Sequence, residues 1–322
     1  MIGKGPIVSA IVVSYNTCKM TLDCLHALHA DLAGLEAEIW VVDNASTDGS
    51  PAAIRAMFPT VRLLENKDNV GFGAANNQAM AQACGEFFLL LNTDAFPKPG
   101  AIAALVMYLR DHSDTAIAGP RLLNADGSLQ ISCFPFPSPA RAWLENLWIS
   151  TILPNHPVMG DYRRWPHDRE RRVDTVIGAC MLVRRSAYEQ VGGFDENFFM
   201  YTEEIEWQRR LRNRGWQVAF TPSAQVTHLG GASGATEKAR INRYFFDSLD
   251  YYEWKHHGMA GLISLRLAMT IGCLMRSLLW TLVLVAVPRR RPLARSKARL
   301  QTWLAVRQAT HWRLGLRGRA RC

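Results

Sequence analysis

IWVVDNASTDGS, residues 39–50, joins four bulky apolar residues to a polar turn, and helix-spaced apolar residues follow from Ser50 to Phe58. β-branched residues in a short apolar run favour a buried strand, whereas Asp, Asn, Ser and Gly favour a turn. Apolar residues at helical spacing predict a helix after that turn. A strand, a turn and a helix in this order make up half of a βαβ unit, which indicates an α/β fold.

The same alternation extends on both sides of this unit through the first 120 residues. Apolar runs predict further strands at residues 7–13, 61–64 and 87–91, and amphipathic stretches predict helices at residues 17–30 and 72–83. Strands that alternate with helices form a mostly parallel central sheet with flanking helices. Because ligands bind beyond the carboxyl ends of such strands, we expect a functional site at that edge of the sheet.

Regular patterning lapses from Cys133 to Arg172. This stretch is rich in Pro, Trp, Phe and Arg and shows no sustained period, so we interpret it as a long irregular excursion. We expect regular structure to return at Val176. After Gly258 the chain becomes strongly apolar. The sequence therefore predicts one α/β domain over residues 1–258 and a helical segment with a basic tail over residues 259–322.

Asp43 immediately follows the strand predicted at residues 39–42. At that position a carboxylate can accept hydrogen bonds from the imide N–H of uracil or thymine, or from ribose hydroxyls. The alternative is a plain helix cap, because Ser46, Asp48 and Ser50 are all good N-cap residues. The residue pattern leaves both interpretations open.

Asp94 follows the apolar strand FFLLLN. A carboxylate at the tip of a central strand can bind Mg²⁺ or Mn²⁺, which in turn binds a diphosphate. His228, in the glycine-rich stretch THLGGAS, is a second candidate, because histidine is the commonest side-chain ligand of transition metals. The alternatives are a turn former at Asp94 and a structural His228. The seven scattered cysteines form no CxxC pair, which indicates a reducing compartment without a zinc site.

Polar residues also follow the first strand, at Tyr15 and Asn16, and the stretch NVGFGAANN at residues 69–77 combines two glycines with a helix start. Backbone N–H groups at such a start favour a phosphate or a nucleotide edge, although a plain glycine turn has the same composition. The stretch is neither a Walker loop nor a GxGxxG fingerprint, which excludes the standard NTPase and dinucleotide sites. The candidate nucleotide-binding residues are Tyr15, Asn16, Asp43, Asn76 and Asn92.

An acidic cluster, YTEEIE at residues 201–206, follows GGFDE at residues 192–196. Carboxylates this close together raise the pKa of at least one of them, which suits general-base catalysis near neutral pH. At helical spacing Glu203 and Glu206 share one face while Glu204 points elsewhere. The alternative is a solvated helix start, where the helix dipole favours Glu.

Taken in order, these motifs resemble family 2 glycosyltransferases of the GT-A fold, which is Rossmann-like, and in particular their rhamnosyltransferase-like branch. The matching stretches run from about Ser9 to Ser233 and are AIVVSYN, EIWVVDNASTDGS, NVGFGAANN, FFLLLNTD, GACMLVRR, GGFDENFFMYTEEIE and HLGGAS. Each motif alone is weak, but seven in the family's order are highly specific.

The resemblance implies a role for each matching position. Asp43 matches the carboxylate that family members direct at the pyrimidine base of the donor. Asp94 matches the last acidic residue of the family's DxD-type metal motif, with Asn92 where many members have the first Asp. His228 matches the late histidine that completes the metal site in several members. The implied cofactor is Mg²⁺ or Mn²⁺.

Glu204 matches the second position of the family's Glu-Asp pair, whose Asp is the catalytic base. Here that position is a Glu, one methylene longer, so its reach changes and Glu203 becomes a second candidate base. The residues implied on the sugar and acceptor side are Gly178, Ala179, Gly193 and Phe194. The implied reaction is a single inverting displacement, in which the base takes a proton from an acceptor hydroxyl.

The branch suggests transfer of rhamnose or a similar sugar from dTDP-rhamnose, or else from a UDP-sugar, to a polyprenyl-diphosphate-linked saccharide in surface polysaccharide synthesis. Two alternatives stay open. A nucleotidyltransferase needs a glycine-rich loop with Lys or Arg after the first strand, and SYNT at residues 14–17 lacks it. A membrane-anchored carbohydrate- or nucleotide-binding protein with a decayed site is compatible with the Glu at position 204.

The net charge of +9 lies in the C-terminal tail, since residues 288–322 hold eleven Lys or Arg and no Asp or Glu. This suits an anionic membrane surface, and without aromatic residues at stacking spacing we expect no nucleic-acid partner. The apolar stretch 261–287 contains Arg266 and Arg276, which weaken insertion. A single span would place the tail opposite the cytosolic donor, against the positive-inside rule. We therefore expect helices along or partly in the cytoplasmic leaflet, at the inner face of the cell membrane.

Overall fold

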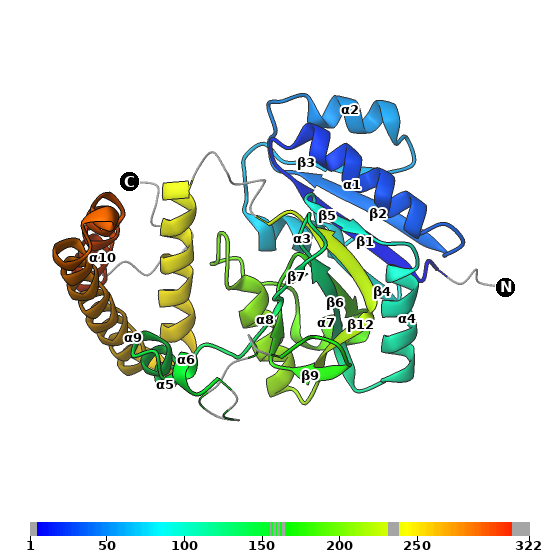
Figure 1. Cartoon of the computed structure of the whole chain (residues 1–322). Helices are drawn as coiled ribbons and strands as arrows, with labels where there is room; N and C mark the ends of the chain where they lie inside the picture. Colours follow the sequence, from blue (N-terminus) through cyan, green and yellow to red (C-terminus); the bar gives the residue numbers. More distant parts are fainter. Residues whose placement is uncertain are drawn as a thin grey trace. The chain divides into compact units, whose positions relative to one another are not determined.

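The computed structural model of this chain describes residues 5–154, 156, 159, 162, 165–230 and 238–310. The chain divides into two compact units, one made of residues 1–136 and 165–245 and the other of residues 137–164 and 246–322 (Figure 1). Residues 311–322 of the basic tail and residues 231–233 of HLGGAS lie outside the described part. The domain boundary expected at residue 258 stays a prediction.

The first unit is built on one large mixed sheet. Its strands are β1 (Val8–Ser14), β2 (Ala37–Asp43), β3 (Arg62–Glu65), β4 (Phe87–Asn92), β5 (Ala95–Pro97), β6 (Thr115–Leu123), β7 (Leu129–Gln130), β9 (Arg171–Val173), β11 (Cys180–Arg184) and β12 (Gln217–His228). They are ordered β3-β2-β1-β4-β11-β6-β12-β5, with β7 beside β6 and β9 beside β12. A second, small sheet pairs β8 (Cys133–Phe134) with β10 (Thr175–Val176).

The helices of this unit connect the strands and pack on the sheet (Figure 1). They are α1 (Cys18–Asp31), α2 (Ser50–Met57), α3 (Phe72–Met80), α4 (Ala101–Asp111), α7 (Arg185–Val191) and α8 (Glu203–Asn213). The strands and helices predicted in the first 120 residues occur at nearly the predicted bounds. The α/β prediction is therefore confirmed.

The strand register explains where the polar clusters meet. β1 pairs in parallel with β2 and β4, and β11 then runs antiparallel between β4 and β6. Ser14 lies opposite Asp43, and Val13 lies opposite Asn92. Three polar clusters that are far apart in the sequence are thus brought to one edge of the sheet, as the sequence predicts.

The core forms because successive residues of a strand face opposite sides of the sheet. Val12 and Leu89 join Leu25 of α1 in a buried cluster that also includes α4. On the other face, Phe88 meets Tyr188 of α7 edge-on, with ring centroids 5.3 Å apart. Apolar burial on both faces leaves the polar strand ends as the place where a ligand can bind.

The excursion from Cys133 to Arg172 is not irregular throughout, so that prediction is wrong in part. It contains α5 (Pro139–Asn146) and α6 (Ile149–Ile152), and regular structure returns already at Arg171. Ser138 caps α5 by accepting a hydrogen bond from Arg141 N at 3.3 Å. The apolar side of α5 packs on the long helix α9, a contact distant in sequence that local periodicity does not reveal.

The second unit continues with α9 (Lys238–Ala286) from residue 246 onward, a 3-10 helix (Pro288–Arg290) and α10 (Arg291–Thr310). α9 bends at Gly258, whose φ is 65°. Asp250 and Arg266 form an ion pair with atoms 2.6 Å apart, whereas a straight helix would separate residues at this spacing by roughly 24 Å. The two halves of α9 therefore fold back on each other. By length and composition, residues 244–286 form the one helix in the described part that is long and apolar enough to cross a membrane.

Candidate active site

Asp43 ends β2 and is 1% exposed. Its Oδ1 accepts a hydrogen bond from Ser46 N at 2.8 Å, and its Oδ2 has no hydrogen-bond partner among the described residues. Such a buried oxygen costs free energy unless a ligand donates to it. The carboxylate does not cap α2, because at the start of that helix Asp48 accepts the hydrogen bond from Ser50 N at 3.1 Å.

The loop after β2 is hydrogen-bonded to the loop after β1. Asn16 N donates to Ser46 Oγ at 2.9 Å, and Thr47 N donates to Asn16 Oδ1 at 2.7 Å. Asn16 has a φ of 50°, a left-handed conformation that Asn adopts more readily than most residues. Tyr15 beside it is 39% exposed, so its ring is accessible to a ligand at this edge.

Asp94 and His228 meet where β5 pairs with the end of β12. Ala95 lies opposite His228 in that pairing, and Leu229 N donates to Asp94 O at 2.9 Å. Asp94 Oδ1 is 3.3 Å from His228 Nε2, and both side chains are buried. The other ring nitrogen, Nδ1, is 2.6 Å from Gln130 Oε1.

This pair offers a carboxylate oxygen and an imidazole nitrogen, a donor set that suits Mn²⁺ or Mg²⁺. In the part of the chain that the structure describes, no group of three His, Cys, Asp or Glu is placed to share one ion. A cation at the pair would complete its coordination with water and nucleotide phosphate oxygens, as Mg²⁺ commonly does. The two side chains therefore fit a metal that binds together with its substrate.

The acidic cluster occupies the first turn of α8. Glu203 and Glu206 are buried on one face, as predicted, whereas Glu204 is partly exposed. Burial, and then the charge of Glu204, raises the pKa of Glu203 well above its ordinary value, and Glu203 Oε2 has no partner among the described residues. Burial also raises the pKa of Glu204, against the lowering effect of backbone N–H groups at Gly178 and the helix start.

Two residues with left-handed backbone precede α8. Tyr201 and Thr202 have φ values of 68° and 69°, a conformation that is costly for a β-branched residue such as Thr202. Burial raises the pKa of Tyr201, and so do the negative charges of Glu203, Glu204 and Asp94. Tyr201 is thus within electrostatic range of both the acidic cluster and Asp94.

The segment before β11 lies at the same edge. Ala179 O accepts a hydrogen bond from Asn92 N at 3.0 Å. A Cβ added at Gly178 would lie 3.7 Å from Glu204 Cγ and 3.7 Å from Phe72 Cε1, which is ordinary van der Waals contact. Gly178 and Ala179 therefore lie next to both the acidic cluster and the end of β4.

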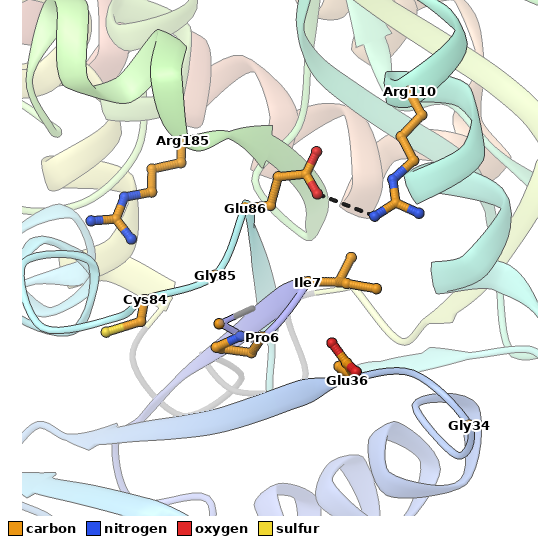
Figure 2. A pocket seen from close by; sticks show the side chains of 10 residues that line it. Pro6, Ile7, Gly34, Glu36, Cys84, Gly85, Glu86, Arg110 and Arg185 are labelled. Atoms are coloured by element: carbon orange, nitrogen blue, oxygen red, sulfur yellow. Dashed lines mark hydrogen bonds and ion pairs between the residues drawn. The ribbon is translucent and has the colours of Figure 1, made fainter. Parts of the chain in front are cut away.

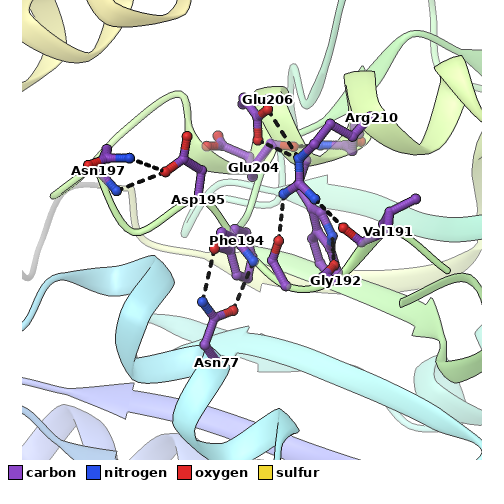
Figure 3. A network of polar contacts seen from close by, with 12 residues as sticks. Asn77, Val191, Gly192, Phe194, Asp195, Asn197, Glu204, Glu206 and Arg210 are labelled. Atoms are coloured by element: carbon purple, nitrogen blue, oxygen red, sulfur yellow. Dashed lines mark hydrogen bonds and ion pairs between the residues drawn. The ribbon is translucent and has the colours of Figure 1, made fainter. Parts of the chain in front are cut away.

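Asn77 of α3 holds the loop that follows α7 (Figure 3). Its Oδ1 accepts from Phe194 N at 2.8 Å, and its Nδ2 donates to Phe194 O at 2.9 Å. A Cβ at Gly193 would lie 2.1 Å from Asn77 Oδ1, so only glycine fits there. From α8, Arg210 donates to Gly193 O and pairs with Glu206 at 2.9 Å. The loop is thereby fixed from two helices.

Two predicted site residues have side chains that point inward. Phe194 is 4% exposed, and the centroid of its ring lies 4.5 Å from that of Trp207. Asn76 is buried, and its Nδ2 donates to Phe72 O at 3.0 Å within α3. The acceptor-side role of Phe194 and the nucleotide-binding role of Asn76 stay predictions.

Comparison with protein families gives one assignment. The model described as "Glycosyl transferase family 2" matches residues 9–192, more than half of the chain, and "Glycosyl transferase family group 2" matches residues 129–316. The chain belongs to glycosyl transferase family 2. This membership excludes the nucleotidyltransferase alternative.

Relatives of this family member include N-acetylglucosaminyl-diphospho-decaprenol L-rhamnosyltransferase of Mycobacterium tuberculosis, which is 36% identical over 202 residues, 59% of this chain and 66% of that protein. The low-salt glycan biosynthesis hexosyltransferase Agl10 of Haloferax volcanii is 27% identical over 224 residues, 68% of this chain and 66% of that protein. The matched region spans slightly less than two thirds of either relative. The resemblance to the rhamnosyltransferase-like branch is confirmed.

Solved structures with the same fold include mannosyltransferase PcManGT from Pyrobaculum calidifontis in complex with GDP-Man and Mn²⁺. Its TM-score is 0.53 at 18% identity, and the match covers 97% of this chain and 89% of that one. GalNAc-T7 with UDP, GalNAc and Mn²⁺ has a TM-score of 0.52, 15% identity and coverage of 80% and 52%. At these identities the likeness establishes the fold alone. The chain has the predicted GT-A fold.

An open depression of about 740 Å³ lies at the opposite edge of the sheet (Figure 2). It is lined by residues that precede β1, β2 and β4, among them Pro6, Glu36 and Glu86, and Arg110 pairs with Glu86 at 3.1 Å. Because ligands of parallel sheets bind beyond the carboxyl ends of the strands, this depression is not the candidate active site.

Sequence reasoning did not single out Asn77, Gln130 and Arg210. Asn77 lies within the stretch 69–77 and directly follows Asn76, and this pair of Asn residues is a usable signal. Arg210 stands four residues after Glu206, a spacing typical of helical ion pairs. Gln130 carried no signal, because its partner His228 is distant in the sequence.

Proposed function

We propose that this chain is an inverting, metal-dependent hexosyltransferase that transfers rhamnose or a similar sugar from a dTDP- or UDP-sugar to a membrane-linked saccharide in surface polysaccharide synthesis. The gathering of Asp43, the Asp94–His228 pair and Glu204 at one edge of the sheet carries the proposal. The Mycobacterium relative is named as an L-rhamnosyltransferase of N-acetylglucosaminyl-diphospho-decaprenol, which supports both the sugar and the acceptor class.

Asp43 supports a donor with a uracil or thymine base. Both bases present an imide N–H, and the unpartnered Oδ2 of Asp43 is a buried acceptor for such a donor. Tyr15, exposed in the adjacent loop, offers a ring on which a base can stack. Because both pyrimidines share the imide group, Asp43 favours a dTDP- or UDP-sugar without distinguishing them.

Asp94 and His228 would hold the divalent cation. Two solved structures with this fold contain Mn²⁺ together with a nucleotide or nucleotide sugar, which supports the cofactor class. When bound, the cation neutralises negative charge that develops on the departing diphosphate. Asn92 is neutral, so Asp94 supplies the anionic ligand at the end of β4.

Glu204 is the proposed base, because it is partly exposed and Glu203 is buried. Burial raises its pKa above that of an exposed Glu, which makes its carboxylate a stronger base. Glu204 takes the proton of an acceptor hydroxyl while the hydroxyl oxygen attacks the anomeric carbon of the donor. The bond from that carbon to the diphosphate oxygen breaks, and the configuration inverts.

The second unit supports attachment to a membrane surface. Between residues 259 and 287 the only charged side chains are Arg266 and Arg276. Arg266 is 3% exposed and pairs with Asp250, and Arg276 donates to Asn146 Oδ1 at 3.1 Å. The charge of Arg266 is thus neutralised within the unit, and Arg276 is hydrogen-bonded there, so neither guanidinium lies on the exposed apolar face of α9.

That face forms a continuous apolar stripe along α9. Its exposed members recur at helical spacing and are Ile263, Leu267, Ile271, Leu274, Leu278, Leu282 and Val285. α10 runs antiparallel beside α9, since Ser277 Oγ lies 2.8 Å from Thr302 Oγ1 and Arg266 donates to Gln308 O at 3.2 Å.

The antiparallel pairing favours helices in the plane of the membrane over a single span. If α9 crossed the bilayer, α10 would carry the exposed Arg291, Arg295 and Arg299 into hydrocarbon. The free-energy cost of inserting each Arg near the centre is about 2.5–3.5 kcal/mol. In the plane, the stripe enters the lipid and the basic residues contact anionic headgroups. This arrangement keeps the enzyme at the cytoplasmic face, beside a lipid-linked acceptor.

Transfer between defined substrates tests the proposed activity. We expect the full chain with Mn²⁺ to transfer rhamnose from dTDP-rhamnose, or a hexose from a UDP-sugar, to N-acetylglucosaminyl-diphospho-polyprenol, detected by mass spectrometry. NMR of the product should show the inverted anomeric configuration. If no donor is consumed although a nucleotide or a saccharide raises the Tm, the decayed-site alternative is correct instead.

A further inference from the structure

Gln130 contacts His228 through both ends of its side-chain amide. It ends β7, which pairs with β6 so that Gln130 lies opposite Leu122. Its Oε1 lies 2.6 Å from His228 Nδ1, and its Nε2 donates to His228 O at 3.3 Å. The amide is therefore fixed to the end of β12 by two contacts with the same histidine.

The direction of these hydrogen bonds follows from their surroundings. Gln130 Nε2 also donates to Asn124 Oδ1 at 3.0 Å, and Asn124 Nδ2 donates to Leu129 O at 3.4 Å. Carbonyl oxygens only accept hydrogen bonds, so these amides have one consistent orientation. Gln130 Oε1 then accepts from His228, which places the ring proton on Nδ1 and leaves a lone pair on Nε2.

That lone pair faces a carboxylate. His228 Nε2 and Asp94 Oδ1 are 3.3 Å apart, and both atoms are electron-pair donors in this tautomer. In the neutral ring these two atoms repel each other at this distance, and a proton on Nε2 or a metal cation bound to both would relieve the repulsion. Gln130 thus makes Nε2 the ring nitrogen that can bind a cation beside Asp94.

We propose that Gln130 is a positioning residue for the metal site: it holds the His228 proton on Nδ1 and directs Nε2 at the ion. The inference rests on the metal site of the proposed function. A hydrogen-bond acceptor behind a metal-binding histidine fixes the tautomer and the ring orientation, and its loss typically lowers metal affinity about 10–100-fold.

The turn before β7 keeps Gln130 in place. Asn124 N donates to Ser128 O at 2.8 Å, and Gly127 has a φ of 82° within the same turn. Asn124 therefore orients the amide of Gln130, and Asn124 Nδ2 in turn donates to Ser128 Oγ at 2.9 Å. Ala125 is exposed on the same turn, so Ala125→Ser is the matched control.

The inference can be tested by isothermal titration calorimetry of the full chain. The measured quantity is the Mn²⁺-dependent affinity for dTDP or UDP, with no sugar transfer taking place. We expect Gln130→Met to weaken this binding about 10–100-fold with the affinity in chelator unchanged. Gln130→Glu keeps an acceptor for Nδ1 and should retain most of the Mn²⁺ dependence. Ala125→Ser should behave as wild type, and equal Tm values for the variants would show that they fold.

Combining Gln130→Met with His228→Ala shows whether Gln130 acts through the histidine. We expect the double variant to bind the nucleotide no more weakly than His228→Ala alone. If Gln130 acts only through His228, its substitution has no further effect once the histidine is gone. Additive losses would overturn the inference, and so would a Gln130→Met variant with wild-type Mn²⁺ dependence, while the proposed function would stand. If wild type shows no Mn²⁺ dependence at all, the proposed metal site fails and the inference fails with it.

Discussion

Asp94 Oδ1 lies 3.3 Å from His228 Nε2 because the three-residue strand that follows Asp94 pairs with the end of β12. The short strand β5, Ala95–Pro97, turns the chain after β4 so that it pairs with the end of β12. Neither side chain alone is a strong ligand for Mg²⁺ or Mn²⁺, so metal binding depends on this pairing. The pair is also part of the sheet edge at which Asp43 lies.

Asp94→Ala should abolish the Mn²⁺ dependence of dTDP or UDP binding, because it removes the one anionic side chain of the pair. Calorimetry should then give the same weak affinity with Mn²⁺ as with chelator. Asp23→Ala, at an exposed Asp that pairs with Lys19 at 2.7 Å, is the matched control and should bind as wild type. Full activity of Asp94→Ala in the presence of chelator would refute the metal assignment.

Glu204→Gln should lower kcat by about two to four orders of magnitude, because it preserves the shape of the side chain and removes the proton acceptor. The KM for the donor should barely change, since the carboxylate is proposed to act on the acceptor hydroxyl. Initial rates with varied donor check both values. If Glu203→Gln shows this loss and Glu204→Gln does not, the base is Glu203.

Glu203→Gln should stabilise the catalytic unit at neutral pH. Burial and Glu204 raise the pKa of Glu203 in the folded state, so its contribution to stability is present below the unfolded pKa and is lost as pH rises through the folded pKa. The substitution removes that loss, and each kcal/mol regained raises the Tm by about 2–4 °C. Differential scanning fluorimetry should show the gain at pH 7–8 and little at pH 4.

The control for this measurement is Glu189→Gln, an exposed residue paired with Arg185 at 2.9 Å, which should leave the Tm nearly unchanged at both pH values. A Tm of Glu203→Gln that falls at neutral pH would mean that the ionised carboxylate has a stabilising partner, contrary to the burial argument.

The elements that the sequence predicts well are those whose signals are local. The alternating runs up to residue 91 indicate the parallel strands, and Asp43 and Asp94 are recognisable because each directly follows one. α5 was missed because its apolar side is buried by α9, which is far away in sequence. Gln130 was missed for the same reason, since only the pairing of β7 with β6 places it behind His228.

Gly193→Ala should disrupt the loop between α7 and α8. The added Cβ would lie 2.1 Å from Asn77 Oδ1, and Asn77 is held by both backbone groups of Phe194. Overpacking of this kind costs about 1–3 kcal/mol, and displacement of the loop should also lower kcat/KM. Chemical denaturation and initial rates measure the two effects.

Gly34→Ala separates this steric effect from ordinary backbone strain. Gly34 has a φ of 89° and nothing within 4 Å of an added Cβ, so the variant should lose some stability and keep its activity. If Gly193→Ala is no worse than Gly34→Ala in both measurements, the contact with Asn77 does not fix the loop.

Leu274→Glu combined with Leu278→Glu should release the protein from lipid. Both residues lie on the exposed stripe of α9, and two carboxylates there would have to enter the membrane beside anionic headgroups. We expect wild type to float with vesicles that contain phosphatidylglycerol and the double variant to stay in solution. Met107→Glu, at an exposed apolar residue of α4 in the first unit, is the control and should float as wild type.

Salt and protease distinguish a surface-bound helix from a span. Each basic residue near anionic lipid contributes about 1 kcal/mol, and salt screens that attraction. High salt or carbonate should therefore release a substantial part of the wild-type protein from membranes, whereas the apolar stripe retains the remainder. A spanning helix would resist both treatments and place the basic tail outside. Complete resistance, together with cleavage of the tail by a protease added to intact spheroplasts, would overturn the in-plane arrangement of α9 and α10.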